Sequence, residues 1–145
     1  MSFQKAIEFA NETGRCFLAT AERDQPHVRA MRMWYADESG FYFHTGTGKR
    51  LGDQLFANKK VEAVFHDPGE DPTLPGRTLR VTGAVEIMED AALEQRLLEE
   101  RSWLKAIFAA YPNDRLIIFR IAHGTVQPWD MSINNREKTI PPIEF

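Results

Sequence analysis

The chain has 145 residues, of which 43% are hydrophobic, and this is enough for one compact domain whose core needs neither metals nor disulfides. Its net charge of −3 argues against a general nucleic-acid binder, because such proteins usually carry a basic excess along one face. Cys16 is the only cysteine, and no apolar run approaches the roughly 20 residues that span a bilayer, so we expect a cytoplasmic protein with no membrane segment.

The first third of the chain is typical of one helix followed by short strands. Ser2 is suited to cap a helix that runs to about Glu12, and Gly14 stands where such a helix would stop. Apolar or alternating runs then predict strands over residues 16–21, 27–35 and 41–44.

Two helices and four strands are predicted in the rest of the chain. The helices cover about residues 49–58 and 90–110. The strands cover residues 61–66, 78–86, 116–121 and 124–129, a loop rich in Pro and Gly covers 67–76, and the tail to residue 145 has no regular pattern. Many short strands with few helices predict a mainly β fold with helices, a small antiparallel barrel in a single domain over residues 1–145.

The segment 41–55 runs from an apolar strand through a Thr/Gly turn into a basic helix. The turn can direct backbone N–H groups, the Thr45 and Thr47 hydroxyls and the cations of Lys49 and Arg50 toward one point. A helix N-terminus adds a dipole that favours an anion. The segment therefore predicts a phosphate site.

Two familiar nucleotide loops do not fit this turn. A Walker loop needs a glycine five residues before Gly48 and a Ser or Thr after the lysine, where this chain has Phe43 and Arg50. The third glycine of the dinucleotide fingerprint is replaced by Leu51. The alternative is that the glycines only connect a strand to a helix and that the basic residues are solvated.

A second cationic segment lies on the predicted strand 27–35. Strict alternation places Arg29, Met31 and Met33 on one face of that strand and Ala30, Arg32 and Trp34 on the other. Arginine beside a flat apolar surface suits an aromatic ligand with anionic groups. The alternative is that both arginines are surface charges on an edge strand.

No protein group stands out as a catalyst or metal ligand. The four histidines, His27, His44, His66 and His123, lack metal-ligand spacing, and no serine or cysteine lies in a nucleophile elbow. We therefore predict no metal site, leave the catalytic residues unknown, and expect any difficult chemistry to come from a cofactor.

Taken in order, five motifs resemble the pyridoxamine 5'-phosphate oxidase-like family of FMN-binding split barrels, especially its oxidase-related, general-stress-type members. The motifs are Cys16-Phe-Leu-Ala-Thr20, Pro26-His-Val-Arg-Ala-Met-Arg-Met33, Phe41-Tyr-Phe-His-Thr-Gly-Thr-Gly-Lys-Arg50, Val61-Glu-Ala-Val-Phe65 and Leu79-Arg-Val-Thr-Gly-Ala-Val-Glu-Ile87. The resemblance implies a six-stranded antiparallel split β-barrel flanked by helices, and a homodimer with FMN in the cleft between the subunits.

The resemblance also implies which residues hold the cofactor. On the strand 27–35 these are Arg29, Ala30, Met31, Arg32 and Met33; in and after the turn they are His44, Thr45, Lys49 and Arg50; late in the chain it is Trp129, as a residue contributed by the partner subunit. Trp34 and Leu51 stand where the true oxidases carry basic residues, and the tail lacks their arginine-rich ending. Oxidation of vitamin B6 is therefore not implied.

Three functions remain open at this point. The first is an FMN-dependent oxidoreductase that passes reducing equivalents to or from a small-molecule redox substrate. The second is a non-catalytic module that binds or senses flavin. The third is a haem-binding split-barrel protein, with His44, His66 or His123 as the axial ligand.

Overall fold

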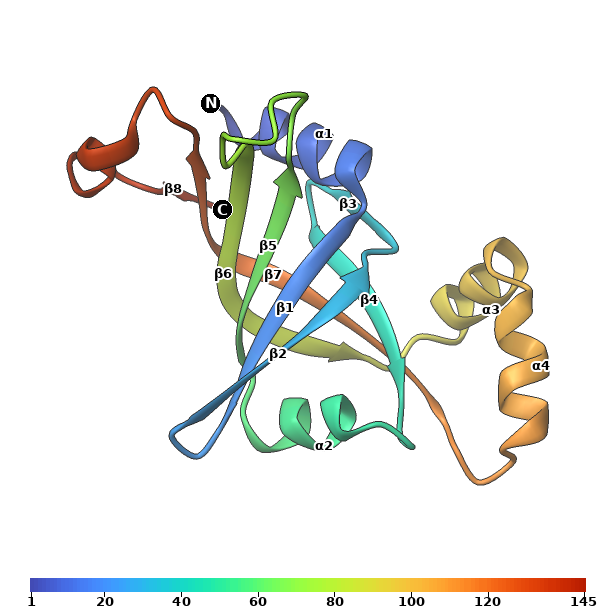
Figure 1. Cartoon of the computed structure of the whole chain (residues 1–145). Helices are drawn as coiled ribbons and strands as arrows, with labels where there is room; N and C mark the ends of the chain where they lie inside the picture. Colours follow the sequence, from blue (N-terminus) through green and yellow to red (C-terminus); the bar gives the residue numbers. More distant parts are fainter.

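The computed structural model describes residues 1–145 as a strongly curved antiparallel sheet with helices around it (Figure 1). The helices are α1 (Phe3–Thr13), α2 (Arg50–Ala57), α3 (Ala91–Glu100), α4 (Trp103–Ala110) and the 3-10 helix η1 (Asn134–Thr139). The strands are β1 (Arg15–Glu22), β2 (Gln25–Arg32), β3 (Tyr35–Asp37), β4 (Gly40–Gly46), β5 (Lys60–Asp67), β6 (Arg77–Met88), β7 (Leu116–Trp129) and β8 (Ile143–Glu144). None of the helices is both long and apolar enough to cross a membrane.

The sheet has eight strands, where six were expected. Its order is β2-β1-β5-β6-β7-β4-β3, and β8 pairs with β7. The predicted strand 27–35 is in fact two strands, because β2 pairs with β1 and β3 pairs with β4 at the opposite edge. The tail, predicted to be irregular, forms η1 and adds β8 beside Thr125 and Val126.

The two edges of the open sheet approach each other where β2 passes into β3. The backbone N–H of Met33 donates to the carbonyl of Gly14 (2.8 Å), and the N–H of Trp34 donates to the carbonyl of Tyr42 (2.9 Å). Consecutive residues thus bond to the start of β1 and to β4, which are the strands next to the two edges of the sheet. We call residues 33–34 the seam.

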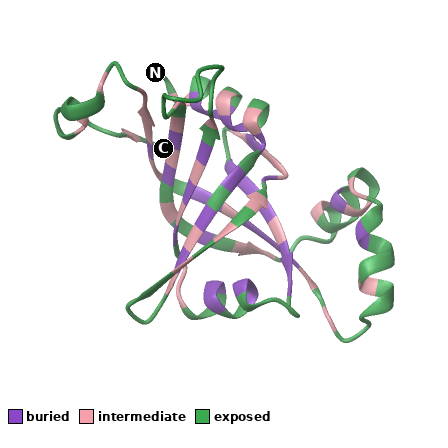
Figure 2. Cartoon of the chain, viewed as in Figure 1, coloured by how far each residue is buried: buried purple, intermediate pink, exposed green.

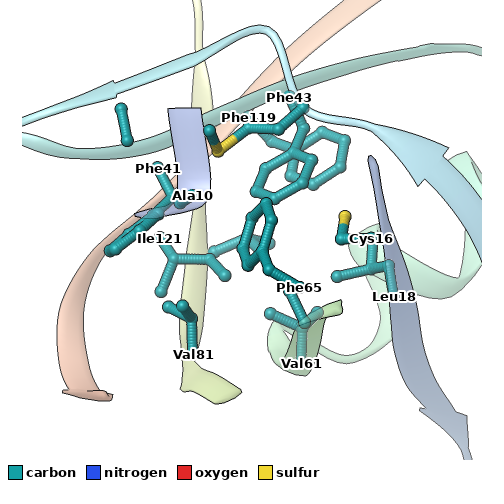
Figure 3. Packing of buried hydrophobic residues seen from close by; sticks show 14 of the residues in the cluster. Ala10, Cys16, Leu18, Phe41, Phe43, Val61, Phe65, Val81, Phe119 and Ile121 are labelled. Carbon is teal, nitrogen blue, oxygen red and sulfur yellow. The ribbon is translucent and has the colours of Figure 1, made fainter. Parts of the chain in front are cut away.

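The core fills the inside of the curved sheet. Phe43 and Phe119 stack with ring centroids 5.3 Å apart, and Phe65 is fully buried near them (Figure 3). At one end α1 buries Ile7 and Ala10, with Ser2 capping it and Gly14 ending it as expected. At the opposite end α2 buries one side, including Leu51 and Leu55 (Figure 1).

The last two predicted strands, 116–121 and 124–129, form the single strand β7. Pairing with β6 jumps from Ala84 opposite His123 to Val85 opposite Ile121, so Ala122 is an extra, bulged residue. A Cβ on Gly124 would overlap the carbonyl of Thr82 in β6. Here glycine permits close approach of two strands within a bend, so the chain continues as one strand where two were predicted.

The helix predicted over residues 90–110 is broken into α3 and α4. Arg101 leaves the helical region (φ −124°, ψ 64°) at the break. Leu97 and Leu104, one from each helix, pack with Ile118 of β7 on the outside of the sheet. Figure 2 shows that α4 is otherwise almost wholly exposed.

The tight turn before β4 gives a test of the fold. Gly40 has φ 131°, and a Cβ there would overlap the carbonyl of Ile121. We expect Gly40→Ala to lower the free energy of unfolding by about 3 kcal/mol or more. Gly69, with φ 68° and nothing within 4 Å of its missing Cβ, is the matched control, and Gly69→Ala should cost only about 1 to 2 kcal/mol. Equal losses in urea denaturation would contradict this packing.

Candidate functional site

Arg29 ties β2 to the helix that follows the Thr/Gly turn. Its Nη1 donates to the carbonyl of Leu18 (3.2 Å) and to Thr20 Oγ1 (2.9 Å), and its Nη2 donates to Gln54 Oε1 on α2. The guanidinium is half-buried, has no carboxylate within ion-pair distance, and burial lowers its pKa. The structure therefore holds an uncompensated positive charge beside α2, one turn from Arg50.

The turn itself leaves the start of α2 open to an anion. Lys49 is the N-cap residue, but no side chain caps the helix, so its first backbone N–H groups lack a side-chain acceptor. The Thr47 hydroxyl is already used, because it accepts from the backbone N–H of Arg115 (2.8 Å) and braces the turn against β7. Lys49 and Arg50 are exposed and take part in no ion pair.

Thr45 is the one buried polar side chain without a partner. The residue is only 4% exposed, and its Oγ1 makes no hydrogen bond. Leaving a buried hydroxyl unpaired costs about 1 to 3 kcal/mol. A ligand oxygen that reached Oγ1 after a small movement of the turn would remove that cost.

His44 and Arg101 form a hydrogen-bonded pair at the seam. Arg101 donates to the Met33 carbonyl (2.8 Å) through Nη2 and to His44 Nε2 (2.6 Å) through Nη1. A guanidinium can only donate, so His44 Nε2 must accept and the ring proton lies on Nδ1. Burial, with the charges of Arg101 and Lys49, lowers the pKa of His44 to about 4. His44 is therefore a neutral donor near pH 7.

The other predicted residues of β2 lie on two faces, as the alternation indicated. Arg29 and Met31 are half-buried, whereas Ala30 and Arg32 are exposed. Ala30, Met31 and Arg32 line a groove of about 340 Å³ together with Phe17 and His66. Met33 is in the core, and its carbonyl is the group that Arg101 binds.

Trp129 lies apart from the turn within one chain. It borders a different groove, of about 380 Å³, with Thr78 and residues of the tail. The structure thus brings His44, Thr45 and Lys49 to one cavity and leaves Trp129 in another. Whether these residues bind a cofactor stays a prediction.

Several residues of this region escaped the sequence reasoning. A cavity of about 310 Å³ lies between the turn and α4, and it is lined by His44, Lys49, Trp103, Ile107, Tyr111 and Asp114 among others. The sequence analysis predicted one helix over residues 90–110. It therefore did not select Arg101, because the break between α3 and α4 that places its side chain was not predicted. One signal for this region was present in the sequence. Trp103, Ile107 and Tyr111 recur every four residues and so form an apolar stripe on a helix, separate from the stripe of leucines.

The family of the chain follows from its sequence over most of its length. The model of the pyridoxamine 5'-phosphate oxidase family matches residues 3–129, so the chain belongs to that family. Pyridoxine/pyridoxamine 5'-phosphate oxidase from Shewanella sp. (strain MR-4) is 34% identical over 65 residues, which are 45% of this chain and 31% of that protein. The match thus spans about a third of the length of this curated relative.

Solved structures share the fold. A NimC/NimA family protein from Clostridium acetobutylicum has a TM-score of 0.74 at 22% identity, covering 98% of this chain and 92% of that one. A FAD-binding protein from Mesorhizobium loti has a TM-score of 0.62 at 21% identity (88% and 94% covered). HutZ, the haem storage protein from Vibrio cholerae, has a TM-score of 0.63 at 15% identity (90% and 95% covered). At these identities the likeness establishes the fold alone.

The His44–Arg101 pair predicts a specific pH dependence. Between about pH 4 and the ordinary histidine pKa near 6.5, the unfolded chain binds a proton at His44 that the folded chain does not. The free energy of unfolding should therefore fall as pH is lowered through this window, and it should fall less in His44→Gln.

In an NMR titration, Arg101→Met should raise the His44 pKa because one repelling charge is gone. An unchanged pKa would show that Arg101 has no electrostatic influence on this ring.

Proposed function

We propose that the chain is an FMN-binding oxidoreductase that works as a homodimer on a small-molecule redox substrate. The observation that carries the proposal is the uncapped start of α2 with Arg29, Lys49 and Arg50 around it, in a chain of the pyridoxamine 5'-phosphate oxidase family. A phosphate monoester is the anion that such a cluster of N–H donors and cations fits. The FAD-binding neighbour from Mesorhizobium loti also supports a flavin.

Each part of this cluster has a distinct task toward a flavin phosphate. Lys49 and Arg50 would neutralise its charge, and the N–H groups at the start of α2 would donate to its oxygens. Arg29 would keep α2 in place through Gln54 and add a fixed positive charge. The orphan hydroxyl of Thr45 would gain the partner it lacks in the free chain.

A second copy of the chain would complete the site. The outer face of β1 and β2 carries an apolar patch in which Phe17 is 52% exposed and Val28 is 69% exposed, with Ala19 and Ala30 paired opposite them. Burying such a patch is favourable at about 25 cal/mol per Å². A partner on this face would cover the groove at Ala30, Met31 and Arg32, and Trp129 would then come from the partner subunit.

The flavin would supply the one- or two-electron chemistry, and the residues of the chain would hold and tune it. Burial, and then the charge of nearby Arg32, lower the pKa of Arg101, and neither arginine takes part in an ion pair. Positive charge of this kind stabilises electron density that develops nearby. No side chain is assigned as a general acid or base.

Haem is the alternative that the likeness to HutZ brings forward. In two of the candidate axial ligands, Nε2 already has a partner within the chain. Nε2 of His44 accepts a hydrogen bond from Arg101, and Nε2 of His66 lies 2.9 Å from the Pro75 carbonyl. The absorption spectrum of the purified protein separates the two cofactors, because oxidised flavin gives two broad bands in the near ultraviolet and blue, whereas haem gives one intense Soret band.

Arg50→Ala tests the phosphate contact. Loss of one charge-assisted contact should weaken FMN binding about 10- to 100-fold in a fluorescence titration while leaving the fold intact. Lys138→Ala, which removes an exposed cation on η1, is the matched control and should change nothing. Equal affinities for the two variants would overturn the assignment of the turn.

Thr45→Val separates binding from stability. Valine has nearly the same shape without the hydroxyl, so the free protein should be equally stable or gain up to about 1 kcal/mol. FMN affinity should fall, because the phosphate loses a partner. If affinity is unchanged, Thr45 takes no part in the site.

Turnover distinguishes an oxidoreductase from a binding module. Under anaerobic conditions, NADH or NADPH should reduce the protein-bound flavin faster than free FMN. Reduction no faster than in free solution, with either donor, would favour a module that only binds or senses flavin.

A further inference from the structure

Three polar residues form a hydrogen-bonded triad at the end of the sheet that α2 covers. We call Thr20, Arg29 and Gln54 the α2 triad. Arg29 donates to Thr20 Oγ1 (2.9 Å) and to Gln54 Oε1, and the Thr20 hydroxyl donates to the same oxygen of Gln54 (2.6 Å). Thr20 is only 3% exposed and Gln54 only 4%. The side-chain oxygen of Gln54 thus accepts from both other members and holds the guanidinium in one place.

Every acceptor around Arg29 is neutral. The acceptors are the amide of Gln54, the hydroxyl of Thr20 and the backbone carbonyl of Leu18. Arg120, which is half-buried like Arg29, instead lies 2.9 Å from the carboxylate of Glu86. A carboxylate holds a guanidinium more strongly than an amide does, because opposite charges attract. A contact that served the fold alone therefore has a stronger alternative, which this chain uses at Arg120 and not at Arg29.

A carboxylate stands one position before Gln54, yet it does not compensate Arg29. Asp53 is exposed and takes part in no ion pair. Successive residues of a helix point in different directions, so α2 buries Gln54 and leaves Asp53 outside. The charge of Arg29 therefore stays uncompensated about one helical turn from Arg50, at the uncapped start of α2.

We propose that Gln54 is a positioning residue for the phosphate of a bound flavin. It keeps Arg29 in place and, because it is an amide and not a carboxylate, it leaves the positive charge of Arg29 available to an anion at the start of α2. The inference rests on the proposed function and adds the buried residue on which the preference for phosphate depends. Gln54 acts through Arg29 and does not touch the ligand. The attraction grows with the charge of the ligand, so a phosphate dianion gains most.

Gln54→Glu separates the hold on Arg29 from its free charge, because glutamate has nearly the shape of glutamine. The new carboxylate would still accept from Thr20 and Arg29, so the fold should be retained and the midpoint of urea denaturation should be unchanged or higher. FMN affinity should fall at least about tenfold at about pH 8 in a fluorescence titration, since the charge of Arg29 is neutralised. Riboflavin, which has no phosphate, should bind the two proteins equally.

Two further variants are the controls. Gln4→Glu adds the same charge on the exposed side of α1, at the opposite end of the sheet from α2 (Figure 1), and should leave FMN affinity unchanged. Gln54→Met keeps the length of the side chain but has neither a charge nor an oxygen acceptor. It should lower the free energy of unfolding, because Thr20 and Arg29 lose their shared acceptor, but weaken FMN at most about threefold.

The pH dependence adds a measurement that a purely structural role would not change. Protonation makes the new carboxyl of Gln54→Glu neutral, like the amide that it replaces. A bound phosphate favours this protonated form, because two like charges repel. The difference in FMN affinity between the wild type and Gln54→Glu should therefore shrink as pH is lowered from about 8 to about 5. A difference that is constant with pH would contradict the proposal.

Four further results would overturn it. They are a Gln54→Glu chain that does not fold, equal FMN affinities of Gln54→Glu and Gln4→Glu, equal losses of riboflavin and FMN affinity in Gln54→Glu, and a loss in Gln54→Met as large as in Gln54→Glu. The first would show that the fold, and not the ligand, requires the amide. In each case a wild type that binds FMN leaves the proposed function standing. A wild type that binds no FMN would contradict the flavin assignment, and the role of Gln54 with it.

Discussion

The closure of the sheet at the seam is the constraint on which the rest of the structure depends. Met33 and Trp34 are neighbours in the chain, yet the N–H of Met33 bonds at the start of β1 and the N–H of Trp34 bonds to β4, the strands next to the two opposite edges of the sheet. Backbone N–H groups point in alternate directions along an extended chain. The N–H groups of two consecutive residues can therefore both find acceptors here only if the sheet curves until its two sides meet. The buried phenylalanines then fill the space inside the curve.

The same seam organises the polar groups outside the core. Arg101 reaches the Met33 carbonyl only because α3 stops one residue earlier, and from there it also meets His44. One guanidinium thus links the helical pair to the seam and to β4, and it fixes the tautomer of an imidazole. Arg29 plays a similar part on the inner side, where it joins β2 to α2 through Gln54. Both arginines keep a positive charge without a carboxylate partner, and this is the electrostatic basis of the candidate site.

The turn after β4 brings together groups with opposite preferences for an anion. The start of α2 attracts anions, whereas Asp114 lies against Gly48 and opposes them. The turn therefore favours an anion on the side of α2 and disfavours one beside Asp114. Membership of the pyridoxamine 5'-phosphate oxidase family supports the proposal of a flavin phosphate at the start of α2.

Local patterns in the sequence were enough for the elements that depend on neighbouring residues. Ser2 and Gly14 bound α1, and alternation correctly placed Arg29 and Met31 on one face and Ala30 and Arg32 on the other. The turn before Lys49 was also located from its composition. Caps, turns and faces are properties of a few consecutive residues, so they can be predicted without knowledge of distant partners.

What only the tertiary structure decided is where long-range partners interrupt or extend those patterns. The strand 27–35 splits because its two ends pair with different edges, the helix 90–110 breaks because Arg101 turns toward Met33 and His44, and β7 continues through Gly124 because β6 approaches it closely. Each of these contacts joins residues far apart in sequence. The amino-acid sequence therefore determined the family, the turn and the cationic residues, whereas folding decided which of them meet, since only packing brings distant groups within hydrogen-bonding distance.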